Sequence, residues 1–455
     1  MKKPIFASVL SAVIWGSGQL YNKQYLKGIL FLAIQVILIS VELLTGDYFS
    51  GSFHFREAGF FVSGFWGMIT LGTQLSELTM DGITEGDHSI MLLLQGIIAV
   101  MVAMVFVVIW VINIKDAYKT SKIFNETKQV ISSKEWLLET WEKSFEYLVL
   151  IPAAIMLMLF VFMPIIFSFA VAFTNYNADN MPPANLISWV GFQNFRFLFS
   201  MGENVSGGNV WLHTFVNVSK WTLIFAVIAT IVPFFLGLLQ AVAINHKEVK
   251  YKKLWRSIFI LPWAMPALIS LLNFQQIFNG QFGPLNRFLM NHGIISNPIL
   301  WLSDSQNPWL PRMTILVIQF WLAFPYFMAL MSGVMTSISK DIYEASEIDG
   351  ANERQQFWRI TLPLVISATA PLLVMSFASN FNNFGIIYFL TGGGPTNPNF
   401  IYAGQTDILI SWIFNLTLNH RMYNMASVMS VFIFLVIGSI SAYNFTKTRA
   451  FKEEL

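Results

Sequence analysis

The sequence predicts an all-α polytopic membrane protein, and three observations carry that prediction. Of the 455 residues, 55% are hydrophobic and only 11% are charged, whereas an ordinary soluble domain carries about 25% charged residues. Apolar runs recur along the chain, and a helix of about 20 apolar residues crosses a bilayer core of about 30 Å. Lys and Arg collect in alternate connections between these runs. A water-soluble globular enzyme is therefore excluded.

We expect eight membrane spans, the first only just long enough to cross. They are 28–44, 89–113, 147–174, 221–243, 257–279, 313–336, 364–390 and 424–446. Two shorter apolar stretches, 5–20 and 59–72, could be interfacial or re-entrant segments. Ten spans are possible if both cross, but this would place Lys23 and Lys27 outside, so eight is preferred. The first 20 residues lack a following cleavage site, and we expect them to be retained.

The distribution of positive charge predicts the direction of the spans. Of the 27 Lys and Arg residues, 21 fall in one set of alternate connections and both ends of the chain, and six fall in the other set. Cytoplasmic connections carry the excess of Lys and Arg in membrane proteins. Both termini are therefore expected in the cytoplasm. The predicted organisation is a membrane region at 1–114 with two spans, a basic cytoplasmic linker at 115–146, a six-span domain at 147–450 and a cytoplasmic tail at 451–455.

The six spans from residue 147 onward contain no Asp, Glu, Lys or Arg. Ion-coupled carriers usually place ionisable groups inside their spans, so an ion-coupled transporter is the less favoured alternative. Glu42 is the one carboxylate inside a proposed span, and we interpret it as an interfacial residue. The chain has no phosphate loop, no cysteine and no ligand-spaced histidine pair. We therefore expect no catalytic residue, no metal site and no cofactor in this chain.

Uncharged polar residues and aromatic residues occur together in the later spans. Buried amides are costly in lipid unless they are paired. One interpretation is hydrogen bonding between helices. The other is a cavity for a neutral, hydroxyl-rich ligand, with hydroxyls on the amides and C–H faces on the rings. The spacing of Ser376, Ser379, Asn380 and Asn383 places all four on one face of a helix.

Residues 341–363 lie between two spans, and we expect them to form a cytoplasmic loop. Their residue pattern is distinctive. The pattern predicts a short helix, a turn at Asp349-Gly350, and a second amphipathic helix that ends before Pro363. The apolar residues of the loop could lie at the membrane interface or dock into a partner.

The loop has Glu344-Ala345, then Gly350-Ala351, then Ile360, Leu362 and Pro363. At these spacings it resembles the EAA loop of ABC importer permeases, with Ser346 in place of the second alanine. The resemblance covers about 147–450 and implies the six-helix core of a type I importer. In that family the loop is a coupling helix that docks into an ATPase subunit. The implied ATPase-coupling residues are Glu344, Ala345, Asp349, Gly350, Ala351, Phe357 and Pro363.

Three further segments, beginning at Leu261, Phe320 and Ser376, resemble the larger permease subunit of maltose/maltodextrin importers. The short connection at 175–220 and the segment 18–23 look more like the Gram-positive type, which lacks a large external domain. Sugar-contacting positions of the family correspond here to Trp263, Gln319, Leu322, Ala323, Tyr326, Ser376, Ser379, Asn380 and Asn383, and also to Ala267. Several of these differ from the family residue: Trp263 replaces a tyrosine, for example, and Ser379 a phenylalanine.

The resemblance implies a permease subunit for maltose or maltodextrins in a bacterial plasma membrane. Another oligosaccharide, such as a galacto-oligosaccharide, is the alternative substrate. The implied partners are a second homologous permease, two ATPase subunits that bind ATP and Mg, and an extracellular sugar-binding protein or lipoprotein. Membrane lipid surrounds the chain, and no nucleic acid is expected.

Overall fold

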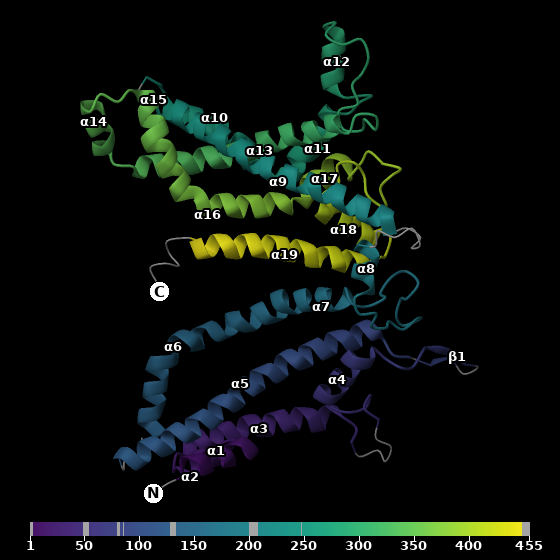
Figure 1. The fold of residues 1–455 in the computed structure, drawn as a ribbon, viewed down its shortest axis with the longest axis vertical. Helices are drawn as coiled ribbons and strands as arrows, with labels where there is room; N and C mark the ends of the chain where they lie inside the picture. The colour runs from purple at the N-terminus through teal and green to yellow at the C-terminus, as the bar shows by residue number, and fades with distance from the viewer. Residues whose placement is uncertain are drawn as a thin grey trace. The chain divides into compact units, whose positions relative to one another are not determined.

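The computed structural model describes residues 3–48, 54–79, 82–84, 86–127, 133–199, 208–246 and 248–447. Seven helices in this part of the chain are long and apolar enough to cross a membrane, or eight if one bent pair counts as a span. The expected all-α class and the preferred span number are therefore confirmed. The described chain divides into two compact units, Met1–Gly191 and Phe192–Leu455, and Figure 1 labels their elements.

The first unit contains both shorter apolar stretches as short helices. Its elements are α1 (Pro4–Val13), α2 (Ser17–Tyr21), α3 (Tyr25–Thr45), α4 (Phe60–Thr70), β1 (Glu77–Thr79), β2 (Gly82–Thr84), α5 (Ser89–Thr127), α6 (Ser133–Leu157), the π-helical turn η1 (Met158–Phe162) and α7 (Met163–Val171). A ten-residue helix is about 15 Å long, half of a bilayer core. α1, α2 and α4 are therefore each shorter than a span.

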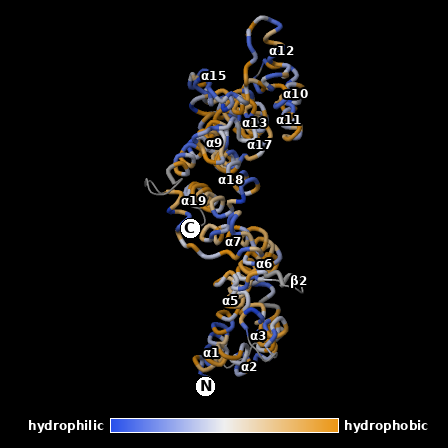
Figure 2. The backbone as a smooth tube through the Cα atoms, turned by 90° about the vertical axis from the view of Figure 1, so that its right-hand side faces the viewer, coloured by the Kyte–Doolittle hydropathy of each residue, from blue (hydrophilic) through white to orange (hydrophobic). Residues whose placement is uncertain are grey.

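The expected basic linker is helical where it is described. Residues 115–127 continue α5 beyond its apolar part, and 133–146 begin α6. Residues 128–132 of this linker, and the tail expected at 451–455, lie outside the described residues. Figure 2 shows hydrophobic residues along most of the long helices and hydrophilic residues at α15 and beside α12.

Polar side chains join α1 and α2 to α5. Gln19 donates to the carbonyl of Asn113 (2.9 Å) and to Asp116 (3.1 Å). Asn113 in turn accepts from the backbone N–H of Gly16 and donates to the carbonyl of Ser11. These buried bonds satisfy polar groups at and near the turn between α1 and α2. Lys27 of α3 also pairs with Asp116, at 2.8 Å.

Glu42, which we interpreted as an interfacial residue, has defined hydrogen-bond partners in the structure. Its carboxylate accepts from the backbone N–H groups of Phe61 (2.7 Å) and Val62 (3.4 Å) and from the hydroxyl of Tyr48. The first N–H groups of a helix have no partner within it. Glu42 therefore caps the start of α4.

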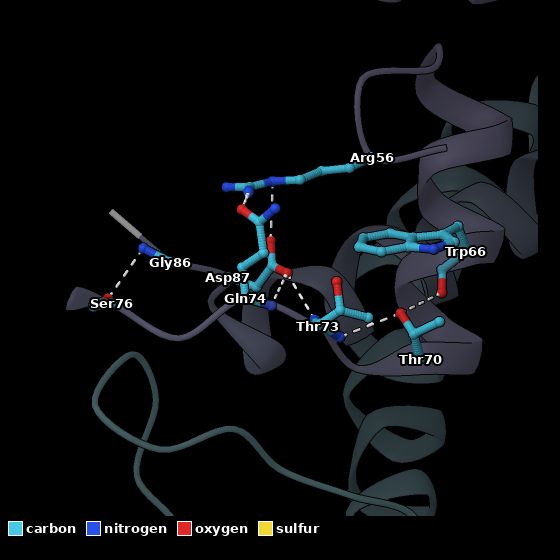
Figure 3. A network of polar contacts seen from close by, with 9 residues as sticks. Arg56, Trp66, Thr70, Thr73, Gln74, Ser76, Gly86 and Asp87 are labelled. Atoms are coloured by element: carbon cyan, nitrogen blue, oxygen red, sulfur yellow. Dashed lines mark hydrogen bonds and ion pairs between the residues drawn. The ribbon is translucent and has the colours of Figure 1, made fainter. Parts of the chain in front are cut away.

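The buried carboxylate of Asp87 holds the residues that follow α4 (Figure 3). It accepts from the backbone N–H groups of Thr73 (2.8 Å) and Gln74 (3.0 Å). It also pairs with Arg56, whose Nε lies 3.0 Å away, and Arg56 donates to Gln74 as well. A charge that is this buried is tolerated because three donors satisfy it.

The second unit is a bundle in which α9 packs against α13 and α16. Its elements are α8 (Gln193–Phe199), α9 (Gly208–Asn245), α10 (Lys252–Ala264), α11 (Ala267–Ile277), α12 (Pro284–Asn291), α13 (Trp309–Ser337), α14 (Lys340–Ile348), α15 (Glu353–Gln356), the π-helical turn η2 (Phe357–Thr361), α16 (Leu362–Phe381), α17 (Phe384–Thr391), α18 (Leu409–Leu418) and α19 (Tyr423–Lys447). Two groups of buried apolar residues form the core of this unit. One lies around Trp221 and Ile315, the other around Phe234 and Met331.

The span expected at 257–279 is broken, which corrects the prediction of one continuous helix. α10 and α11 meet at an angle of 85°. Met265 between them is extended, with ψ 139°, because a proline disfavours the helical conformation of the residue before it. Pro266 therefore starts a new helix in another direction.

The pattern predicted that the second helix of the 341–363 loop ends before Pro363. This prediction is wrong, because the helix continues through Pro363. α15, η2 and α16 run on as one helix, and the N–H of Leu362 bonds to the carbonyl of Phe357, five residues back. A proline ring clashes with the carbonyl four residues before it in a regular α-helix, and the wider π turn relieves that clash. η1, which precedes Pro164, has the same arrangement.

Candidate functional site

A cavity of about 570 Å³ in the second unit is lined by Ala267 and by all nine other residues that the family pattern suggested. They come from α10, α11, α13, α16 and the start of α17, so side chains up to 120 positions apart share one wall. The lining residues are Trp263, Ala267, Leu271, Gln319, Leu322, Ala323, Tyr326, Phe327, Leu372, Met375, Ser376, Ser379, Asn380, Asn383 and Ile386.

Local backbone geometry explains why these side chains converge. Trp263 lies in the last turn of α10 and Ala267 begins α11, so the bend at Pro266 presents both residues to the cavity. On α13 the positions of Gln319, Leu322, Ala323 and Tyr326 follow the spacing of one helical face. The bend and the helical face are thus both encoded locally.

Asn383 does not share a helix with the three polar residues before it. α16 ends at Phe381, and Asn383 is the N-cap of α17, where its side chain accepts from the N–H of Ile386 at 3.5 Å. Asparagine favours this position because its side chain can bond to the first free N–H groups of a helix. The predicted single helical face is therefore wrong for Asn383, although the residue still lines the cavity.

The amide of Asn380 joins three helices at the cavity wall. Its Nδ2 donates to the carbonyl of Ala229 (3.2 Å) and to the hydroxyl of Thr230 (3.0 Å), both on α9. Its Oδ1 accepts from Nε2 of Gln319 on α13, at 3.0 Å. Asn383 donates to Oε1 of Gln319 at 3.5 Å. Asn380 and Gln319 are each only 8% exposed, so helix-to-helix bonding and cavity lining are combined in the same residues.

Other polar groups of the cavity are open to a ligand. The hydroxyls of Tyr326, Ser376 and Ser379 have no hydrogen-bond partner among the residues described. The indole of Trp263 is 58% exposed. None of the fifteen lining residues is charged. Such a wall offers hydrogen bonds and aromatic faces to a neutral polar molecule, and no countercharge to an ionic one.

Sequence reasoning missed five apolar lining residues. Helical spacing could have found most of them, because Leu271 follows Ala267 by four positions, and Leu372 and Met375 precede Ser376 and Ser379 by four. Phe327 and Ile386 had no such signal. The five are Leu271, Phe327, Leu372, Met375 and Ile386.

The loop that follows α17 is held around the buried carboxylate of Asp407. Asp407 accepts from the N–H of Gly404 (2.7 Å) and the hydroxyl of Ser411 (2.6 Å), and it lies against Gly393. Burial raises the pKa of Asp407 to about 6, and the two donors lower it in part. Among the residues described, no cation pairs with it.

The residues expected to couple to an ATPase lie around the turn between α14 and α15. Glu344 and Ala345 are exposed on α14. The turn that follows is tight: Gly350 has φ +79°, and the N–H of Ala351 bonds to the carbonyl of Ser346. The residues expected to couple are Glu344, Ala345, Asp349, Gly350, Ala351, Phe357 and Pro363.

Two residues of this set do not lie on the exposed tip. Phe357 packs against the buried group around Phe234 and Met331. Pro363 belongs to the first turn of α16.

Comparison with known proteins identifies the family. The family model described as binding-protein-dependent transport system inner membrane component matches residues 233–448. Over 98% of both chains, the sequence is 37% identical to the galactooligosaccharides transport system permease protein GanP of Bacillus subtilis. It is 36% identical to the maltodextrin transport system permease protein MdxF of the same organism, over 98% of this chain and 96% of MdxF.

A relative from Vibrio matches less of the chain. The maltose/maltodextrin transport system permease protein MalF of Vibrio vulnificus is 38% identical over 52% of this chain and 45% of its own length. The resemblance to the Gram-positive type of larger permease is thus confirmed by the full-length matches.

A solved structure supports the fold. The structure of a bacterial ABC transporter involved in the import of the acidic polysaccharide alginate contains a chain that superposes with a TM-score of 0.54 at 23% identity, covering 68% of this chain and 96% of that one. The multi-pass helical architecture is therefore that of ABC importer permeases. The chain belongs to the binding-protein-dependent transport-system inner-membrane family, as a permease of an ABC importer whose role is transport and not catalysis.

Proposed function

We propose that this permease passes neutral oligosaccharides, most directly maltodextrins, through the cavity around Trp263 and Asn380. The observation that carries the proposal is the uncharged wall, which contains hydroxyl groups, amide groups and aromatic rings. A sugar has the matching surface, with hydroxyls around its edge and C–H groups on its faces. An anionic sugar would need Arg or Lys in the wall.

Galacto-oligosaccharides are the alternative substrate of the same site. GanP and MdxF are nearly equally similar to this chain, and both sugars are neutral and hydroxyl-rich. The cavity positions assigned above would contact either one.

We propose the remaining parts of the transporter from the family. They are a second homologous permease, two ATPase subunits that bind ATP and Mg, and an extracellular sugar-binding protein. A solved relative in complex with a periplasmic protein carrying an alginate pentasaccharide supports the last of these. The excess of Lys and Arg on one side supports cytoplasmic termini.

The exposure of the 341–363 loop supports the coupling role that we propose for it. Ile348 at the tip is 87% exposed and Trp358 is 57% exposed. Apolar side chains that extend from a polar loop into water favour a protein groove as their partner. We place the ATPase subunits at this loop, on the cytoplasmic side.

The test is reconstitution of the full complex in proteoliposomes, with partner subunits taken from neighbouring genes. ATP hydrolysis is measured with the binding protein loaded with a maltodextrin, a galacto-oligosaccharide or an acidic oligosaccharide. We expect stimulation by a neutral sugar and uptake that requires ATP. Uptake driven by an ion gradient without the ATPase subunits would overturn the proposal.

A variant separates the coupling role from folding. Ile348→Glu places a charge at a position that is 87% exposed, so the permease should insert and melt normally. We expect the variant to lose sugar-stimulated ATP hydrolysis. Full stimulation in this variant would contradict the placement of the ATPase subunits.

A further inference from the structure

α14 is poorly held by apolar packing. None of its residues is buried, and its apolar side chains Ile342 and Ile348 are 44% and 87% exposed. Burial of apolar surface normally fixes a short helix in a protein, because a nine-residue helix is marginal alone. Another interaction must therefore fix the direction of α14.

Side-chain hydrogen bonds connect α14 to the helix that follows the turn. Nε2 of Gln356 donates to Oγ of Ser346 at 2.9 Å, and this hydroxyl donates to the carbonyl of Tyr343 at 2.7 Å. The hydroxyls of Tyr343 and Thr361 are 2.9 Å apart. Gln356 and Thr361 are 9% and 5% exposed, so water competes little for these bonds.

The other arm of the turn is anchored in the bundle. Phe357 and Leu362 pack against the buried group that includes Met331 and Val365. Through η2 this arm continues into α16, the helix that carries Ser376, Ser379 and Asn380 of the cavity. The bonds from α14 thus end on a helix that leads directly to the cavity wall.

We propose that Ser346 and Gln356 are positioning residues that make α14 and α16 move as one body, so that a push on the loop displaces the cavity wall. This inference rests on the coupling role proposed above. Ser346 stands where the resembled pattern has alanine, which has no hydroxyl. In this chain the serine supplies the acceptor for Gln356, and the substitution is therefore a functional addition to the loop.

Hydrogen exchange tests the geometric part on the full chain with its partner permease in lipid nanodiscs. Ser346→Ala should speed amide exchange in 340–350 by about 2- to 10-fold, as expected for loss of one hydrogen bond. Ser346→Thr, which keeps the hydroxyl, should restore slow exchange. Gln356 also donates to the carbonyl of Tyr343, at 3.4 Å. The double variant with Gln356→Leu should therefore show less than the sum of the two single effects, because both substitutions break the shared bond between Ser346 and Gln356.

Ser257→Ala is the matched control, because its exposed hydroxyl donates only within its own helix, to the carbonyl of Lys253. It should leave exchange in 340–350 unchanged. Exchange in Ser346→Ala that equals the parent chain, or additive effects in the double variant, would overturn the inference.

The number of sugars moved per ATP in the assembled transporter tests the functional part. Ser346→Ala should lower this ratio at an unchanged melting temperature, and Ser346→Thr should restore it. If Ile348→Glu uncouples transport while Ser346→Ala loosens α14 without changing the ratio, the positioning role fails and the proposed function stands. If neither variant changes the ratio, the coupling role of the loop itself fails.

Discussion

Gln319 donates to Asn380 at 3.0 Å across two helices, and the same Asn380 amide donates to Thr230 on a third. The same residues that line the cavity therefore also connect three helices of the bundle, α9, α13 and α16. A residue of this kind affects stability as well as any ligand, whereas a hydroxyl without a protein partner affects the ligand alone. Variants of the two kinds should be distinguishable.

Asn380→Ala should destabilise the permease by about 1–3 kcal/mol, because the buried amide of Gln319 and the hydroxyl of Thr230 lose their partner. A lower melting temperature together with weaker uptake is the expected result. Ser376→Ala is the comparison: uptake should require a severalfold higher sugar concentration at an unchanged melting temperature. Thermal melting and uptake kinetics measure both. An unchanged melting temperature in Asn380→Ala would show that the hydrogen bonds of Asn380 contribute little to stability.

Trp263 should contribute an aromatic face to the substrate. Trp263→Ala should raise the sugar concentration for half-maximal uptake about tenfold or less, since stacking supplies about 0.5–1.5 kcal/mol beyond buried area. Trp263→Tyr, which keeps a ring, should remain close to the parent chain. Uptake titrations in proteoliposomes measure this. Equal uptake by the alanine and tyrosine variants would argue against the ring contact.

Asp407 predicts a pH dependence of stability. Burial raises its pKa to about 6 from the ordinary 3.8, so the folded state favours the protonated carboxyl. Its contribution is therefore fully present below pH 4 and is lost as the pH rises through 6, by about 3 kcal/mol at most.

Asp407→Asn removes this titration and keeps an oxygen for Gly404 and Ser411. The loss of stability between pH 4 and 7 should become smaller, as measured by melting temperature against pH. Asp179→Asn, at an exposed carboxylate, should leave the profile unchanged. A parent profile that is retained in Asp407→Asn would contradict the prediction.

Gly393 should not tolerate a side chain. Its φ is +88°, and a Cβ atom there would collide with the carboxylate of Asp407. We expect Gly393→Ala to lower the free energy of unfolding by about 1–3 kcal/mol. Gly385→Ala is the control, because its Cβ would meet only Phe389, at 3.9 Å. Chemical or thermal unfolding measures the stability of the two variants. Equal stability in Gly393→Ala and Gly385→Ala would contradict the predicted clash.

Much of the architecture could be predicted because it is local. Apolar runs mark the long helices, and the uncharged character of the cavity follows from spans without Asp, Glu, Lys or Arg. The turn at Gly350 follows from its neighbours. The breaks were less predictable: Pro266 separates two helices by 85°, whereas Pro363 lies within a continuous helix. In the second case a π turn removes the clash, and composition alone does not distinguish the two outcomes.

The sequence by itself determined which segments are helical, how apolar they are and which polar residues they carry, since these depend on residues a few positions apart. Only the tertiary structure decided how those polar groups are used. Asn380 bonds to Thr230, 150 positions away, and to Gln319, 61 positions away, and Glu42 caps a helix that begins 18 positions later. A buried polar group takes whichever partner packing brings within about 3 Å, and packing is a property of the whole bundle.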